Sequence, residues 1–334
     1  AGVRDSHEWD VYRLVLSENE PFKAHRDPIT CVALASPATV CSCSRDATLK
    51  VLQLEVSPEG GEVGMMTRRS FTSSDPPLSA CAISHDTKFA VATSWDNYVY
   101  SFSIPNACVV SKLPAHDDGV SDLHLDDSAT RLVTGAWDAT VKVWGVSPAT
   151  GAIDPSPLLE LYDHENSVQA VRFDPDGHHV AAGADDGTLI VWECSSEVAL
   201  FSTLVSPAGR AVTSIRWARL PRLGPAASVL CSTEDGFVRL LDLRARQLAA
   251  VQAGCAVRCV ELDGRAVYGA CEDGSIRVWA VEAEAGELRE VTRRRAAHEG
   301  AVTTVAASAG GRVLVSGGDD GCIRAWNVDF VAGR

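Results

Sequence analysis

The sequence predicts an all-β fold, a seven-bladed β-propeller formed by the whole chain of 334 residues. Two observations lead to this prediction. A tight turn centred on aspartate, followed by a strand of alternating apolar residues, recurs seven times. Before each turn lie further stretches with a period of two, and no segment keeps a helical period. A four-stranded sheet cannot bury both faces alone, so we expect the units to stack radially around an axis.

The seven copies set the expected blades. The turn aspartates lie 38 to 50 residues apart, which leaves room for four short strands in each unit. They are Asp46, Asp96, Asp138, Asp186, Asp235, Asp273 and Asp320. The expected blades cover approximately residues 24–55, 77–104, 115–146, 163–194, 208–243, 253–281 and 297–328. The last copy has no room for its outermost strand, so we expect residues 8–23 to close the ring.

Composition and charge narrow the range of partners. Hydrophobic residues make up 46% of the chain and charged residues 22%, as in ordinary globular proteins. The net charge of −14 would repel a phosphate backbone, which argues against nucleic acid. No run of 18 apolar residues occurs, so any membrane association is expected to be indirect. The basic triplet Arg293–Arg295 is either a solvated loop or a docking site for an acidic partner.

The 11 cysteines indicate a reducing compartment. They are odd in number, and most lie in strand-like runs where a thiol acts as a small apolar side chain. Cys41 and Cys43, like Cys255 and Cys259, lack a second pair at zinc-ligand spacing. The first residues show neither the basic nor the apolar region of a secretion signal. We therefore expect no metal, no cofactor and a cytoplasmic location.

Three marks of the repeats resemble the WD-repeat family: a Gly- or Ala-His dipeptide, the aspartate turn and a terminal Trp. The resemblance implies that a complete blade carries a hydrogen-bonded tetrad of His, Ser or Thr, Asp and Trp. Such a tetrad would satisfy the ring nitrogens of a semi-buried His and the carboxylate of a tight turn. Two blades match in full, the third with His116, Thr134, Asp138 and Trp144, and the seventh with His298, Ser316, Asp320 and Trp326.

The other five blades match the tetrad only in part. The first has Leu52 in the Trp place, and the fourth has Ala182 in the hydroxyl place. The second, fifth and sixth lack the His, and the hydroxyl place holds Ala92, Cys231 and Gly269. We interpret this joint loss as avoidance of unpartnered buried polar groups, each of which costs about 1 to 3 kcal/mol.

The recurrence of Ser, His and Asp does not indicate catalysis. These residues repeat at a fixed spacing in several blades, which is typical of a structural role rather than a single triad. The motifs of serine hydrolases, zinc proteases, P-loop nucleotide hydrolases and dinucleotide-binding enzymes are all absent from the sequence. We therefore expect a non-enzymatic protein.

The residue before each turn aspartate is the candidate partner-binding position, because propellers of the family usually bind partners on this face. These positions hold Arg45, Trp95, Trp137, Asp185, Glu234, Glu272 and Asp319. The two Trp residues either cover the seam between blades two and three or anchor a partner. The carboxylates of blades four to seven are either merely solvated or bind a basic segment. Arg258 is a candidate to neutralise Glu272.

Residues 77–144 carry a longer resemblance, through SWDNYVYSFSI, AHDDGVSDL and AWDATVKVW. They are similar to two repeats of the C-terminal WD domain in BEACH-domain proteins, in the branch of factors associated with neutral sphingomyelinase activation. The resemblance implies a non-enzymatic adaptor in receptor signalling or membrane trafficking that binds a protein or peptide, such as a receptor cytoplasmic tail. The alternative is another WD scaffold, such as a ubiquitin-ligase substrate receptor or a G-protein-like scaffold.

Overall fold

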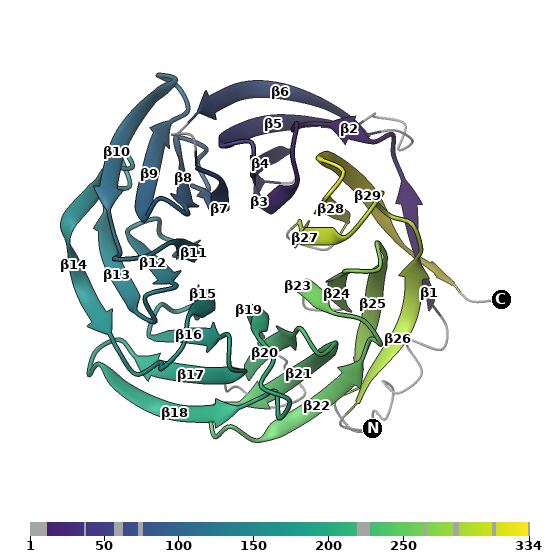
Figure 1. The fold of residues 1–334 in the computed structure, drawn as a ribbon. Helices are drawn as coiled ribbons and strands as arrows, with labels where there is room; N and C mark the ends of the chain where they lie inside the picture. The colour runs from purple at the N-terminus through teal and green to yellow at the C-terminus, as the bar shows by residue number, and fades with distance from the viewer. Residues whose placement is uncertain are drawn as a thin grey trace, which may run out of the picture.

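The protein is a closed ring of seven β-sheets around a central axis, as predicted (Figure 1). The computed structural model describes residues 12–36, 38–56, 63–72, 76–218, 228–263, 266–282, 287–308 and 312–332. All regular elements within these residues are strands. The described part of the chain contains no helix that could cross a membrane.

Each sheet is an antiparallel meander that runs outward from the axis. The innermost strands are β3 (Ile29–Ser36), β7 (Leu78–Ile83), β11 (Val120–Leu125), β15 (Val168–Phe173), β19 (Val212–Ala218), β23 (Val257–Leu262) and β27 (Val302–Ala307). The second strands are β4 (Thr39–Ser44), β8 (Phe89–Ser94), β12 (Arg131–Ala136), β16 (His179–Ala184), β20 (Ser228–Thr233), β24 (Ala266–Cys271) and β28 (Val313–Gly318). The third strands are β5 (Thr48–Val56), β9 (Tyr98–Ser103), β13 (Val141–Val146), β17 (Thr188–Glu193), β21 (Phe237–Asp242), β25 (Ile276–Glu282) and β29 (Cys322–Ala332).

The outermost strands of the first six blades lie beyond the predicted blade ranges, whereas that of the seventh lies within the predicted closing segment 8–23. In blade order, the outermost strands are β6 (Val63–Thr72), β10 (Cys108–Pro114), β14 (Ile153–Leu161), β18 (Val198–Leu204), β22 (Gln247–Gln252), β26 (Glu287–Arg294) and β1 (Tyr12–Glu18). Most of their described side chains are exposed or only partly buried, so their sequences lack the apolar alternation that marks the inner strands. A single parallel bridge, Ala250 to Glu287, links the outer strands of the fifth and sixth sheets.

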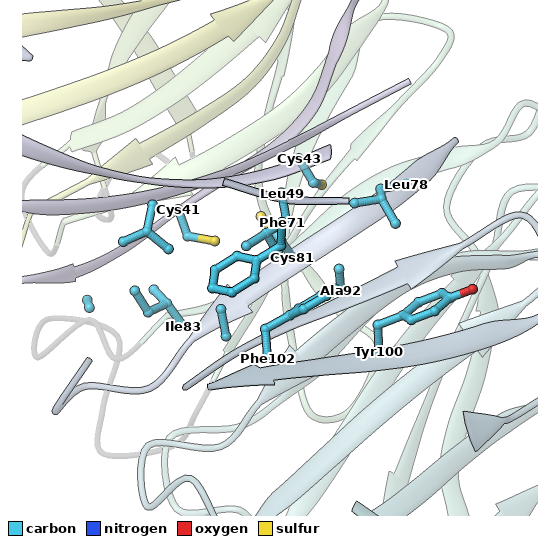
Figure 2. Close-up of a cluster of buried hydrophobic side chains, with 13 residues drawn as sticks. Cys41, Cys43, Leu49, Phe71, Leu78, Cys81, Ile83, Ala92, Tyr100 and Phe102 are labelled. Carbon is cyan, nitrogen blue, oxygen red and sulfur yellow. The ribbon is translucent and has the colours of Figure 1, made fainter. Parts of the chain in front are cut away.

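The core consists of apolar layers between neighbouring sheets. Figure 2 shows the layer between the first two blades, where Cys41, Cys43 and Cys81 pack with larger residues such as Leu49 and Phe102. All three thiols are buried and act as small apolar groups.

The seventh sheet combines the two ends of the chain. Strand β1 pairs antiparallel with β29 along its whole length, from Tyr12 opposite Ala332 to Glu18 opposite Trp326. The short strand β2 (Phe22–Lys23) pairs with the beginning of the same strand. Without β1, the backbone groups of β29 on that side would lose their partners and form a free sheet edge.

A series of hydroxyl groups joins neighbouring blades near the axis. The second residue of the innermost strand is Ser or Thr in five blades, and its hydroxyl donates to a carbonyl of the next blade. For example, Thr30 Oγ1 lies 2.8 Å from the oxygen of Leu78, and Thr303 Oγ1 lies 2.6 Å from that of Ile29. The other three are Ser79, Ser121 and Thr213. Gln169 and Arg258 take this position in the fourth and sixth blades.

We predict that deleting residues 1–20 destabilises the ring, because the deletion removes β1 and leaves β29 at a sheet edge. A lower melting temperature by differential scanning calorimetry would show this. Adding a peptide of residues 8–20 should restore part of the loss, since the peptide can pair with β29. An unchanged melting temperature in the truncated protein would contradict the role of β1 in closure.

Candidate functional site

The seven rim residues, defined as those before the turn aspartates, occupy equivalent places at one end of the ring, called here the turn end. In every blade the rim residue donates its backbone N–H to the carbonyl that lies just before the innermost strand. Examples are Trp137 to Gly119 and Asp185 to Ser167, both at 2.9 Å. The remaining pairs are Arg45 to Pro28, Trp95 to Pro77, Glu234 to Ala211, Glu272 to Ala256 and Asp319 to Ala301. This repeated bond positions all seven side chains around the axis.

The turn that follows each rim residue has one recurring geometry. The residue after the aspartate has a positive φ in all seven blades, for example 66° at Gly321 and 64° at Ala139. Glycine adopts this conformation without strain, and the same position is Gly in the last four blades. The carboxylate of the aspartate accepts the backbone N–H two residues later, as Asp138 does from Thr140 at 3.0 Å.

The two complete tetrads are hydrogen-bonded in the structure. In the third blade, Trp144 Nε1 donates to Thr134 Oγ1 at 2.9 Å, and His116 Nε2 lies 2.8 Å from the same oxygen. Because an indole N–H only donates, the hydroxyl proton is free to bond to Nε2, and Nδ1 then carries the proton that faces Asp138 at 3.0 Å. The seventh blade repeats this arrangement with Trp326, Ser316, His298 and Asp320.

These bonds keep the turn carboxylates ionised. Burial alone would raise the pKa of Asp138, but hydrogen bonds from His116 and Thr140 outweigh it and hold that pKa well below its usual range. The same balance, with His298 as the main partner, lowers the pKa of Asp320 to about 2. The Ser or Thr, His and Asp of these blades thus bond to each other within the blade wall.

The three blades without the His satisfy the turn aspartate by another route. The residue four positions after the aspartate, on the third strand, reaches back to the carboxylate. In the second blade Tyr100 donates its hydroxyl to Asp96. In the fifth, Arg239 Nη1 lies 3.9 Å from Asp235, and in the sixth Arg277 Nη2 lies 3.2 Å from Asp273. Arg324 takes the same position in the seventh blade, 3.7 Å from Asp320, so this contact also occurs beside a complete tetrad. In the fifth blade the hydroxyl of Ser206 donates to Asp235 at 2.8 Å as well.

The fourth blade shows why its hydroxyl could be lost. The residue before its His is Asp163, and Trp192 Nε1 donates to this carboxylate at 2.5 Å instead of to a hydroxyl. Ala182 occupies the hydroxyl place, so Nε2 of the buried His164 has no hydrogen-bond partner among the described residues. Burial lowers the pKa of His164 to about 4, against the opposing charge of Asp186.

A cavity of about 670 Å³ opens at the turn end of the axis. We call it the acidic mouth, and five of the seven rim residues line it: Arg45, Asp185, Glu234, Glu272 and Asp319. The hydroxyl-bearing residues Thr30, Thr213 and Thr303 form part of its wall. Carboxylates of four consecutive blades therefore face one shared space.

Two of these four carboxylates are neutralised locally. Arg258 Nη2 lies 2.8 Å from Glu272, as predicted, and Arg210 Nη1 lies 3.9 Å from Glu234. No ion pair among the described residues involves Asp185 or Asp319. Partial burial and the charge of Glu234 raise the pKa of Asp185, while a hydrogen bond with Gln169 opposes the rise. The mouth therefore keeps an excess of negative charge.

The family model for the WD domain, G-beta repeat, matches four stretches, residues 15–52, 107–145, 155–193 and 289–327. Each stretch begins on the outermost strand of one sheet and ends on the third strand of the next. The first begins on β1, which completes the seventh sheet. The fold is a seven-bladed β-propeller, and four stretches of the chain are similar to the WD40 repeat.

Several curated proteins are similar to this propeller. The chain is 22% identical over 317 residues to Striatin-4 of Homo sapiens. The aligned region covers 89% of this chain and 41% of Striatin-4. The chain is 27% identical over 110 residues to Periodic tryptophan protein 2 homolog of Schizosaccharomyces pombe, covering 32% of this chain and 12% of that protein. It is 34% identical over 77 residues to Transducin-like enhancer protein 2 of Mus musculus, and this region covers 23% of this chain and 10% of that protein. The chain thus spans less than half of each relative.

The two aromatic rim residues lie apart from the acidic mouth. The rings of Trp95 and Trp137 contact each other, with centroids 5.6 Å apart, and both are half-buried. The guanidinium of Arg45 lies 5.5 Å from the Trp95 ring. The indole of Trp137 also covers Gly119, where a Cβ would approach within 2.7 Å of it. The pair therefore packs over the seam between the second and third blades.

The axis of the propeller holds charged groups that sequence reasoning missed. A cavity of about 750 Å³ continues along the axis beyond the acidic mouth, and Asp122, Arg172, Arg216 and Glu261 line it. Arg172 pairs with Asp122, and Arg216 Nε lies 3.1 Å from Glu261. Burial raises the pKa of Asp122, although Arg172 opposes this shift. A charged residue within an otherwise apolar innermost strand is the signal that could have predicted these pairs.

The basic triplet has a structural role in part. Arg293 donates to Asp273 across the sixth blade, and the guanidinium of Arg294 lies 5.7 Å from the ring of Trp326. Both contacts are made within the propeller, in keeping with a structural role for this segment.

We predict that Ala182→Ser stabilises the protein by about 1 kcal/mol, because the new hydroxyl can donate to the unpartnered Nε2 of His164. Gly269→Ser is the matched substitution in the sixth blade and should destabilise, since its Cβ would lie 2.5 Å from Trp279 Cζ3. Urea unfolding of both variants measures the difference. If Ala182→Ser and Gly269→Ser change the free energy of unfolding equally, this account of the hydroxyl place is wrong.

The buried His164 should make stability depend on pH. Its pKa is about 4 in the folded protein and about 6.5 in an unfolded chain. Between these values the unfolded chain binds a proton that the folded protein does not, so the free energy of unfolding falls as pH decreases from about 6.5 to about 4. Burial lowers the pKa of His25 as well, which acts in the same direction. His164→Gln should flatten the plot of unfolding free energy against pH, measured by urea unfolding. If the plots for the variant and the unchanged protein run parallel, His164 is not the source of the pH dependence.

Proposed function

We propose that this propeller is a non-enzymatic platform whose acidic mouth binds a basic segment of a partner protein. The observation that carries the proposal is the convergence of Asp185, Glu234, Glu272 and Asp319 on one cavity. The cavity also contains Arg45 and Arg258, and Arg258 neutralises Glu272. The uncompensated charge belongs to Asp185 and Asp319, which lie on the fourth and seventh blades. A lysine or arginine side chain that enters the mouth would find both carboxylates facing it.

The seam between the second and third blades supplies the second part of the proposed surface. Trp95 and Trp137 lie on the same end of the ring as the mouth and remain partly accessible. Arg45 lines the mouth and contacts Trp95, so it connects the two regions. We propose that the accessible edges of the two indoles hold an apolar side chain of the same partner.

The resemblance of residues 77–144 to BEACH-domain proteins supports a narrower proposal, that the chain acts as a cytoplasmic adaptor in receptor signalling or membrane trafficking. The segments that carry the resemblance are SWDNYVYSFSI and AWDATVKVW, which include both indoles of the seam. A basic stretch of a receptor cytoplasmic tail would match the charge of the mouth. A BEACH module encoded upstream in the same reading frame would support this role, and an F-box there would overturn it.

We predict that Asp185→Asn and Asp319→Asn each weaken binding of a lysine- and arginine-rich peptide by about three- to tenfold, because each removes an unpaired charge from the mouth. Isothermal titration calorimetry at two salt concentrations measures this, and binding should weaken at higher salt. Asp127→Asn is the matched control, since Asp127 is exposed and lines the cavity at the opposite end of the axis. Equal affinity for a glutamate-rich peptide would overturn the proposal.

The same titration tests the aromatic part of the surface. Trp95→Ala and Trp137→Ala should lower the affinity of the folded protein for a partner peptide that carries a large apolar residue beside its basic stretch. Circular dichroism of each variant checks that the propeller is folded. If both variants fold and bind as the unchanged protein does, the indoles are seam packing only and the anchor hypothesis fails.

A further inference from the structure

The sixth blade brings two thiols and a carboxylate together at the turn end. Cys255 lies in the loop between β22 and β23, and Cys271 is the last residue of β24, two positions before the turn aspartate Asp273. Their sulfur and carboxylate oxygen atoms all lie within 4.8 Å of one another. No other group of three potential metal-ligating side chains lies this close together in the part of the chain that the structure describes. The two cysteines lie 16 positions apart in the sequence, which hides this proximity.

The surroundings of the cluster favour thiol chemistry over cation binding. Arg277 Nη2 donates to Cys255 Sγ at 3.7 Å and to Asp273 at 3.2 Å. Arg293 donates to the same carboxylate. A divalent cation in this cluster would be repelled by the two neighbouring guanidinium groups. A thiolate at Cys255 would instead be stabilised by the positive charge of Arg277. Arg277 Nε is buried and has no hydrogen-bond partner among the described residues, so this guanidinium is not fully satisfied.

The two sulfurs differ in accessibility. Cys255 is half-buried and can be reached from solvent, whereas Cys271 is fully buried. Burial raises the pKa of Cys271 to about 12, and the neighbouring Cys255 adds to the rise. Cys271 therefore stays protonated at neutral pH while Cys255 meets any reagent first.

We propose that Cys255 and Cys271 form a redox-active thiol pair, in which a hydroperoxide oxidises Cys255 and Cys271 then closes a disulfide. The proposal does not depend on the partner-binding function of the mouth. It places a reversible covalent modification on the same face, since Glu272 follows Cys271 directly and lines the mouth.

The chemistry balances in two steps. The Cys255 thiolate attacks one peroxide oxygen, the O–O bond breaks, and a sulfenic acid forms while the other oxygen leaves and takes a proton as an alcohol or water. The sulfur of Cys271 then attacks the sulfur of Cys255, the S–O bond breaks, and the departing hydroxide takes the Cys271 proton to give water. Two thiols are oxidised to one disulfide, and one hydroperoxide is reduced to an alcohol and water.

The closure requires a modest movement. A disulfide needs the sulfurs about 2 Å apart, and in the reduced pair they lie within 4.8 Å of each other, so the two sulfurs must approach by less than about 3 Å. The resulting cross-link would tie the loop that carries Cys255 to the turn that begins at Cys271. A thiol reductant would reverse it.

The test treats the full chain with hydrogen peroxide and maps its peptides by mass spectrometry without reduction. We expect a cross-linked peptide that joins Cys255 to Cys271, about 2 Da lighter than the two thiol peptides together. In Cys271→Ser, Cys255 should stop at the sulfenic acid and react with dimedone. The exposed Cys108 is the internal control, and Cys255 should oxidise about tenfold faster than it.

Two variants separate the role of Arg277 from folding. Arg277→Met should slow oxidation of Cys255 several-fold, because it removes the adjacent positive charge. Arg239→Met changes the equivalent position of the fifth blade, where the hydroxyls of Ser206 and Thr233 also donate to Asp235, and should leave the rate at Cys255 unchanged. The proposal is overturned if no peptide joins the two cysteines, if Cys255 and Cys108 oxidise equally, or if zinc alone protects both thiols stoichiometrically.

Discussion

The carboxylate of the turn aspartate is the constraint on which the rest of the propeller depends. In each blade it lies in a tight turn at the end of the sheet, partly removed from water, where an unsatisfied charge would be costly. It accepts the backbone N–H two residues later and so holds the chain reversal. The residue just before it then bonds through its N–H to the start of the innermost strand, as Asp185 does to Ser167. The chain reversal and the rim position of each blade thus depend on the bonds around the turn aspartate.

The way each blade satisfies this carboxylate leaves the rim residue free to vary. A histidine from the preceding loop does so in the third and seventh blades, whereas Tyr100 and Arg277 replace it from the third strand in the second and sixth. The side chain before the aspartate is not part of this bonding, so it can be Trp, Arg, Asp or Glu without loss of the turn. The structure of the ring therefore does not depend on the side chains of the seven rim residues, and these side chains determine the chemistry of the turn end.

Sequence patterns were sufficient for the inner architecture because the first three strands of each blade are largely buried and therefore apolar, with the second strands buried almost throughout. Seven aspartates and the apolar runs around them predicted the ring and the pairing of Arg258 with Glu272. The outer strands of the first six blades, such as β10 with its mostly exposed side chains, lack that apolar pattern, and their positions were not predicted. The contacts of Arg239 and Arg277 with the turn aspartates, and the approach of Cys255 to Cys271, depend on which side chains meet across neighbouring strands. The spacing of residues along the chain does not predict a contact such as that of Cys255 with Cys271, which lie 16 positions apart. It also does not predict that an arginine will bond to the turn aspartate in a blade that lacks the histidine.

The central claim is that the rim residues around the acidic mouth form the surface that meets a partner. A nuclear magnetic resonance titration with a lysine- and arginine-rich peptide tests it most directly, since each rim amide has its own signal. The account predicts the largest shifts at the amides of Asp185, Glu234, Glu272 and Asp319, with the amide of Asp127 at the opposite end unchanged. Shifts confined to the outer strands, or spread evenly over both ends of the ring, would contradict it.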